Sequence, residues 1–105
     1  MLKFIIPSAL MILFAADVSG IEKHSVKPKD GLVPDEKTAV RIAEAVLAPI
    51  YSEKTVEKER PYKAVLNGRV WTVEGTLPAE YQVGGVGIVE LSKDDGRIIR
   101  VSHGR

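Results

Sequence analysis

Residues 35–51 read DEKTAVRIAEAVLAPIY, and the fold of the chain depends on this stretch. At about 100° per residue, its apolar side chains fall on one continuous face of a helix and its charged side chains fall opposite. The apolar face consists of Ala39, Val40, Ile42, Ala43, Val46, Leu47 and Ile50. Such a face needs a second layer to cover it. We therefore expect the rest of the chain to supply a surface for this helix.

Proline and acidic residues mark the two ends of the helix. Pro34 suits the first turn, where its missing N–H is not needed, and Asp35 and Glu36 place negative charge at the positive end of the helix dipole. Pro49 removes one backbone hydrogen bond, so we expect the helix to kink or end there. The charged residues 52–60 that follow are expected to form a solvated connection.

The second layer is a predicted antiparallel sheet, because the apolar residues alternate after Pro61. Asn67-Gly68 is a strong hairpin signal, since a type I′ turn needs positive φ at both central residues. The expected strands are residues 62–66, 69–76, 84–91 and 97–102. The prediction is an α+β fold, with one N-terminal amphipathic helix packed on a four-stranded antiparallel sheet in an α-β-β-β-β meander.

The first 20 residues have the pattern of a secretory signal peptide. Lys3 precedes an apolar run over residues 4–16, which is too short to cross a bilayer of about 30 Å as a helix. Small residues place cleavage after Gly20, so the protein is expected in the periplasm. The alternative is an uncleaved N-terminal anchor, because Asp17 lies close to the apolar run.

Cleavage after Gly20 leaves two parts of the chain. Residues 21–33 show no sustained apolar period and are expected to form a flexible N-terminal arm. Residues 34–105 are expected to form the folded domain. Once the signal peptide is removed, we expect no stable insertion into the membrane.

The composition excludes several classes of function. The chain has 105 residues and a net charge of +1, and its basic residues are interleaved with acidic ones, so it lacks the basic patch of a nucleic-acid-binding protein. It contains no Cys, which excludes disulfides, thiolate metal ligands and a thiol nucleophile. His24 and His103 have no second ligand at helical or strand spacing. We expect neither a metal site nor a cofactor.

No catalytic motif stands out. Glu74 and Glu90 fall on neighbouring predicted strands and could form an acid pair, but alternation favours outward-facing, solvated carboxylates. Gly84, Gly85 and Gly87 lack the following helix that a phosphate loop requires, so they favour close backbone packing or a bulge. We therefore predict no catalytic residue, and a small enzyme is the least favoured function.

Trp71 and Val73 share one face of the second predicted strand, and we expect both to pack against the helix. The alternative places Trp71 at the surface as an interface anchor. With Trp71 inward, the other residues of this strand face outward, where a partner is expected. The candidate partner-binding residues are Arg69, Thr72, Glu74, Tyr81 and Arg100.

Five blocks of sequence occur in order from Val33 to the end of the chain. They are PDEKTAVRIAEAVLAPIY at 34–51, ERPY at 59–62, NGRVWTVEGTLP at 67–78, GGVGIVELSKDDGRIIRV at 84–101 and HG at 103–104. With these blocks the chain resembles a family of small bacterial immunity proteins that have the nuclear transport factor 2 (NTF2) fold. The full fold has several helices, so the resemblance implies a reduced, cystatin-like version here.

The resemblance also implies a function. Members of this family are expected to bind a cognate protein toxin and block it, without catalysis of their own. The alternative is a periplasmic binding or inhibitory module of another kind. Examples are a cystatin-like peptidase inhibitor and a small-ligand carrier that uses a cleft between helix and sheet.

Overall fold

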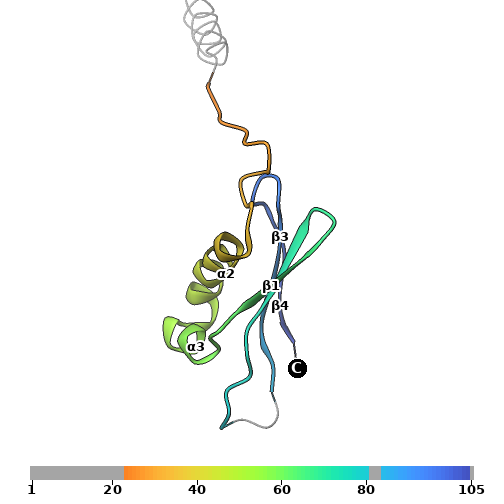
Figure 1. Ribbon diagram of the computed structural model, residues 1–105. Coiled ribbons are helices and arrows are strands. Elements are labelled where there is room, and N and C mark those ends of the chain that lie inside the picture. Colours follow the sequence, from red (N-terminus) through yellow and green to blue (C-terminus); the bar gives the residue numbers. More distant parts are fainter. Residues whose placement is uncertain (1–22, 81–83, 105) are drawn as a thin grey trace, which may run out of the picture.

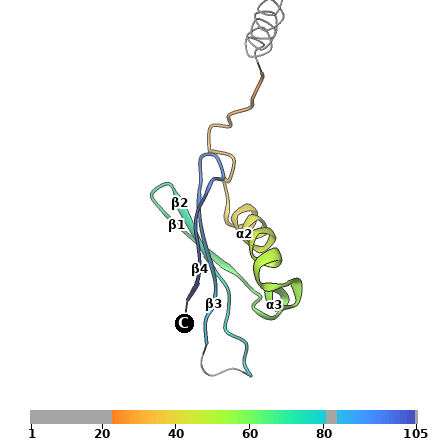
Figure 2. The same ribbon diagram turned by 180° about the vertical axis from the view of Figure 1, so that it is seen from behind.

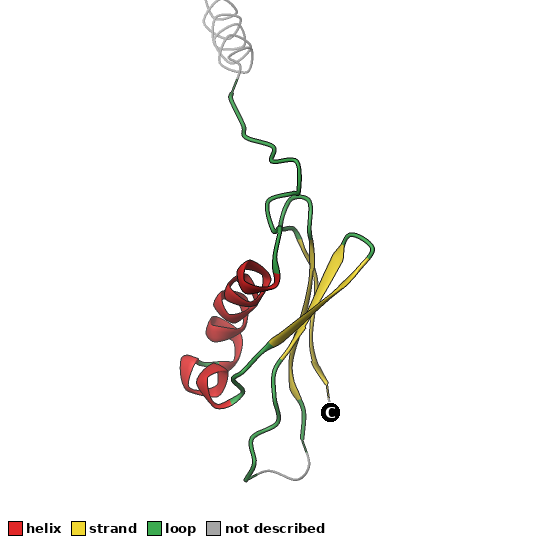
Figure 3. Ribbon diagram, in the orientation of Figure 1, coloured by secondary structure: helices red, strands yellow, loops and turns green. Residues whose placement is uncertain are grey.

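The computed structural model describes residues 23–80 and 84–104, and its helices and strands form two layers (Figure 1). The helices are α2 (Glu36–Tyr51) and α3 (Glu53–Lys58). The strands are β1 (Lys63–Asn67), β2 (Val70–Glu74), β3 (Val86–Ser92) and β4 (Ile98–Gly104), which pair in the order β1-β2-β3-β4. Both helices lie on one side of the sheet in Figures 1 and 2, and Figure 3 distinguishes the two layers by colour. The predicted α+β class and antiparallel meander are confirmed.

The start of α2 is capped by the residue that the sequence indicates. The Asp35 carboxylate accepts a hydrogen bond from the Thr38 N–H at 2.8 Å, which satisfies a donor that the first turn leaves free. Hydrogen bonding from Thr38 also holds the pKa of the Asp35 carboxyl below its ordinary value. The helix passes Pro49 and ends at Tyr51, where Ser52 adopts a φ of 100° and redirects the chain.

The second helix corrects an expectation. Residues 52–60 were predicted as a solvated connection, whereas residues 53–58 form α3 and its Val56 is only 4% exposed. The Ser52 hydroxyl caps this helix by accepting from the Thr55 N–H at 3.2 Å. One apolar residue in a short charged segment produces no helical period, so the sequence pattern could not show the contact with α2 that buries Val56.

The core lies between α2 and the sheet. Its most completely buried side chains are Leu47, Leu91, Val33, Val73 and Val89. Gly87 allows α2 to approach β3 closely, because a Cβ added there would lie 2.9 Å from Leu47 Cδ1. Trp71 is 7% exposed, so the prediction that it packs in the core is confirmed.

Residues 31–33 are part of the folded domain, and this differs from the expected flexible arm over residues 21–33. The Leu32 and Val33 N–H groups donate to the Asp94 and Lys93 carbonyls at 2.9 and 3.0 Å. The Val33 carbonyl accepts from Trp71 Nε1 at 2.8 Å, and the Val33 side chain is 1% exposed. A single buried valine beside a tryptophan has no periodicity, which is why the sequence did not reveal this segment. We call residues 31–33 the N-terminal strap.

Two expectations concern residues outside those that the structure describes. The signal peptide over residues 1–20 and the candidate partner residue Tyr81 both belong to this group. Among the described residues, no helix has the length and apolar character that a membrane span requires.

Candidate functional site

In residues 23–80 and 84–104, no helix covers the side of the sheet that faces away from α2 and α3 (Figure 2). We call it the open face. Register places Val65, Thr72, Glu90 and Arg100 in one row across the four strands. Val65 is 61% exposed. The side chains of the open face include Lys63, Val65, Asn67, Val70, Thr72, Glu74, Ile88, Glu90, Ser92, Arg100 and Ser102.

Apolar and charged groups are mixed on the open face. Arg100 Nη2 donates to Glu90 Oε2 at 3.0 Å, and this hydrogen bond raises the pKa of the Arg100 guanidinium. The Glu90 side chain is 26% exposed and that of Arg100 is 59% exposed, so the pair is open to solvent on one side. Arginine is enriched in surfaces that recognise another protein, and Arg100 lies at the β4 end of a row whose β1 end carries the exposed Val65.

The structure brings three of the five candidate residues together. Thr72, Glu74 and Arg100 all lie on the open face, and Arg100 reaches it from the edge strand β4. Arg69 instead lies in the turn between β1 and β2, where its guanidinium binds the Asp94 carboxylate of the turn after β3. The hydrogen bond from Arg69 lowers the pKa of Asp94. Arg69 therefore joins two turns at one end of the sheet and is a structural contact.

The carboxylates that were considered as an acid pair do not face each other. Glu74 lies opposite Ile88 on β3, whereas Glu90 lies opposite Thr72 and pairs with Arg100. Both are on the open face, as alternation predicted. The ring of His103 lies 5.4 Å from that of Tyr51, and His24 is exposed in the N-terminal segment. Among residues 23–80 and 84–104, no cluster of three His, Cys, Asp or Glu side chains could hold a metal ion.

Sequence reasoning missed a buried carboxylate. Glu59 is 6% exposed, and its Oε1 accepts from the Gly87 N–H at 2.9 Å and from the Tyr62 hydroxyl at 3.5 Å. Burial, followed by the neighbouring charge of Glu59, raises the pKa of Tyr62 to about 12. Gly75 packs against both side chains, because a Cβ there would lie 2.9 Å from the Tyr62 ring and 3.0 Å from Glu59. Glu59, which follows α3, thus links the end of that helix to β3 through the Gly87 N–H, and its role is structural.

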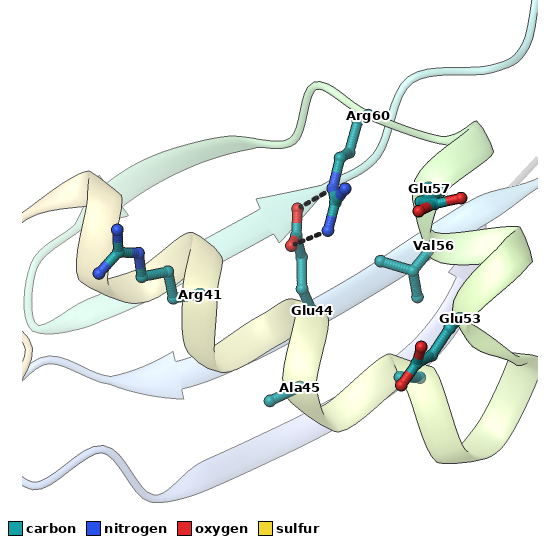
Figure 4. A pocket seen from close by; sticks show the side chains of 8 residues that line it. Arg41, Glu44, Ala45, Glu53, Val56, Glu57 and Arg60 are labelled. Carbon is teal, nitrogen blue, oxygen red and sulfur yellow. Dashed lines mark hydrogen bonds and ion pairs between the residues drawn. The ribbon is translucent and has the colours of Figure 1, made fainter.

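A groove of about 350 Å³ lies between the two helices on their outer side (Figure 4). Arg60 spans it with a two-pronged ion pair to Glu44, with Nε to Oε2 at 3.1 Å and Nη2 to Oε1 at 3.0 Å. Its lining residues are Arg41, Glu44, Ala45, Ala48, Glu53, Val56, Glu57 and Arg60. The sequence did not reveal this groove because it required α3. Its charges are of both signs, and its two central groups already bind each other.

The described hollows lie outside the helix–sheet interface. They are lined by α2, α3, Tyr62 and the segment before α2 together with Asp94 and Asp95. None of them is lined by a residue of β1 to β4. Between α2 and the sheet, the buried side chains of Leu47, Val73 and Val89 pack together instead.

Comparison with known proteins gives a family match. A family model described as NTF2 fold immunity protein matches residues 38–105. The chain is 36% identical over 83 residues to the uncharacterized protein YhhH of Escherichia coli (strain K12), an alignment that covers 79% of this chain and 63% of that protein. It is 35% identical over 86 residues to the uncharacterized protein YbbC of the same organism, with 81% and 67% covered. The chain thus spans about two thirds of the length of these relatives. No solved structure matches it.

Proposed function

The chain belongs to the family of NTF2 fold immunity proteins, and from this we propose that it binds and neutralises a cognate protein toxin. Its action is then stoichiometric binding, with no reaction carried out by the chain itself. The observation that carries the proposal is the family match over residues 38–105, which includes both helices and all four strands except the first residues of α2.

The open face is the surface that we assign to the toxin. A toxin-binding surface must be rigid and exposed, and the strands of the open face are held from behind by the core of α2 and the sheet. Val65 offers exposed apolar area at one end of the row, and the Glu90–Arg100 pair offers charged hydrogen-bonding groups at the other end. Thr72 lies between them in the same row. Such a mixture supports specific recognition, because a wrong partner would bury the Glu90–Arg100 pair without binding its remaining donors and acceptors.

The export pattern of residues 1–20 leads us to propose that this protection takes place in the periplasm. Sequencing the N-terminus of the protein recovered from the periplasmic fraction would test both parts of this proposal. A first residue of Ile21 would support it. A protein recovered with Met1 in the inner-membrane fraction would favour the anchor alternative.

The decisive experiment has two stages. The tagged, exported protein is first captured from its own bacterium, and mass spectrometry identifies what co-purifies in stoichiometric amount. The toxin so identified is then expressed in a susceptible strain with and without this chain. Survival only with the chain is the expected result. A captured partner without toxicity, or a toxin that kills equally in both strains, would contradict the function.

A matched pair of substitutions locates the surface. Val65 on the open face is 61% exposed and Ile50 on the helix layer is 54% exposed, so Val65→Arg and Ile50→Arg place the same charge at similar depth. We expect Val65→Arg to abolish protection and Ile50→Arg to retain it, with both proteins melting as the wild type does. Protection lost only with Ile50→Arg would move the toxin to the helix layer.

The small-ligand alternative has less support. A carrier needs an enclosed cavity, typically of about 300 Å³ or more, beneath its helix. In the described part of the chain that space is filled by Leu47, Val73 and Val89.

A further inference from the structure

We propose that β4 is a pairing edge for a second copy of this chain, so that two sheets join through antiparallel β4 strands into one continuous sheet. This inference does not depend on toxin binding. It rests on the difference between the two edges of the sheet, on the direction of the main-chain groups along β4 and on the self-complementary sequence of that strand.

The β1 edge is protected against pairing at its start. The Ala64 N–H points away from β2 and donates to Glu36 Oε2 at 3.2 Å, so a helix side chain already occupies this edge position. Lys63 stands exposed at the start of the same strand. Both features hinder the addition of another strand. The Glu36 side chain occupies an edge N–H, and the exposed lysine places a charge at the edge.

The β4 edge presents free main-chain groups. The Gly75 N–H donates to the Gly87 carbonyl at 3.1 Å, so Gly87 and every second residue after it on β3 direct their main chain toward β2. The intervening residues, Ile88 and Glu90, direct theirs toward Ser102 and Arg100 of β4. By the same alternation, Val101 and His103 turn their N–H and carbonyl groups to the outside. No described residue outside the sheet donates to or accepts from these groups.

Apolar side chains accompany this free edge. The register between β3 and β4 shifts at Glu90 and Leu91, and beside the shift Ile98 and Ile99 are 37% and 43% exposed. The shift makes Ile99 an extra residue in β4, so the regular part of the free edge runs from Arg100 to Gly104. The two isoleucines at the end of this edge would be partly covered by the end of a second β4.

The sequence of β4 fits a second copy of itself. With the twofold axis at Val101, the two Val101 residues form a hydrogen-bonded pair and His103 lies opposite Ile99 of the other copy. Arg100 lies opposite Ser102 of the other copy, and its charge is already matched within its own chain by Glu90 at 3.0 Å. No unmatched like charges therefore meet across the axis. The ladder is short, and its area falls below the roughly 800 Å² per partner of a standard interface, so we expect a weak, reversible dimer.

Two substitutions at one position test the pairing. His103→Pro removes an N–H that faces outward and leaves the ladder with β3 intact, since proline is tolerated on edge strands in that orientation. His103→Ala removes the ring but keeps the N–H. The exported protein is examined by sedimentation velocity from about 10 µM to about 1 mM, a range that covers weak association. We expect the wild type and His103→Ala to shift toward the dimer, and His103→Pro to associate at least tenfold more weakly.

A register-specific cross-link provides the second measurement. The chain has no Cys of its own, so single cysteines can be introduced cleanly. Across the proposed axis the Val101 Cα atoms lie about 5.5 Å apart, within reach of a disulfide, whereas those of Ser102 lie beyond about 7 Å. Val101→Cys is expected to form a covalent dimer under mild oxidation, and Ser102→Cys is the control that stays monomeric.

Three results would overturn the proposal. The first is a wild type that remains monomeric over the whole range. The second is a His103→Pro variant that associates as the wild type does. The third is a monomeric protein whose toxin complex is lost with His103→Pro, which would assign the β4 edge to the toxin instead.

Discussion

The two faces of the sheet are made from the same strands, yet they differ in what they contact. Toward α2, Trp71 is 7% exposed and Val73 and Leu91 are fully buried. On the open face, Val65 is 61% exposed and Thr72 and Glu90 are only partly covered. Because neighbouring residues of a strand point to opposite faces, stability and recognition are assigned to alternate positions. Substitutions on one face should therefore change the free energy of unfolding, and those on the other should change partner binding.

The largest expected effect is at Trp71, on the covered face. Trp71→Ala should lower the free energy of unfolding by about 3–5 kcal/mol, because it leaves a cavity beside Val33 and removes a buried hydrogen bond. Trp71→Phe keeps most of the apolar area and should cost about 1–3 kcal/mol, through the carbonyl that loses its donor. Urea unfolding measures both. If Trp71→Ala unfolded as the wild type does, the covered face could not be the source of stability.

The N-terminal strap is expected to contribute somewhat less. Deletion through Val33 removes a buried valine and two backbone hydrogen bonds and leaves Trp71 Nε1 without its acceptor. We expect a loss of about 3 kcal/mol in the free energy of unfolding. Deletion of residues 21–30 alone should change it by less than about 0.5 kcal/mol. Equal stability of the two truncated proteins would show that the strap is not part of the covered face.

Stability measured as a function of pH tests whether the fold holds the Tyr62 hydroxyl in its neutral form. Its pKa is raised to about 12 in the folded protein, against about 10 in an unfolded chain. Between these values the unfolded state binds fewer protons than the native state, so the tyrosine's contribution is complete below pH 10 and is lost as the pH rises toward 12. Tyr62→Phe should flatten this part of the stability profile. An unchanged alkaline slope in Tyr62→Phe would mean that the hydroxyl is not held in its neutral form.

The smallest effect on stability is expected on the open face. Arg100→Gln breaks the pair with Glu90, and because the Arg100 side chain is 59% exposed the free energy of unfolding should fall by about 0.5 kcal/mol or less. The affinity for the toxin should fall at least tenfold. Arg97→Gln is the control, since Arg97 pairs with Asp95 in the turn before β4 at 3.6 Å. A loss of stability above 2 kcal/mol with unchanged toxin affinity would reverse the assignment of the two faces.

Expectation and structure agree where a pattern repeats along the chain. The apolar face of α2, the Asp35 cap and the alternation of Trp71 and Val73 are local features that the structure contains. Ile50 is the exception on the helix face, because it lies in the last turn after Pro49 and is 54% exposed. They differ where a contact joins single residues that are distant in sequence. Val56 packs on α2, Val33 covers Trp71, and Glu59 binds the Gly87 N–H 28 residues away.

The candidate partner-binding residues divide in the same way, into those placed by a local pattern and one whose position depends on a distant contact. Alternation correctly placed Thr72 and Glu74 on the open face. It could not show that Arg69 binds Asp94, because that contact depends on two turns meeting at one end of the sheet.

By itself, the sequence determined one amphipathic helix, four short strands and the face of each that would be buried, because apolar period and turn chemistry act between near neighbours. The tertiary structure alone decided that α3 forms, that the strap closes over Trp71 and that a carboxylate is buried at Glu59. It also decided which sheet edge is left open. These features arise from single contacts between distant segments, whose cost in chain entropy is offset only when the whole core assembles.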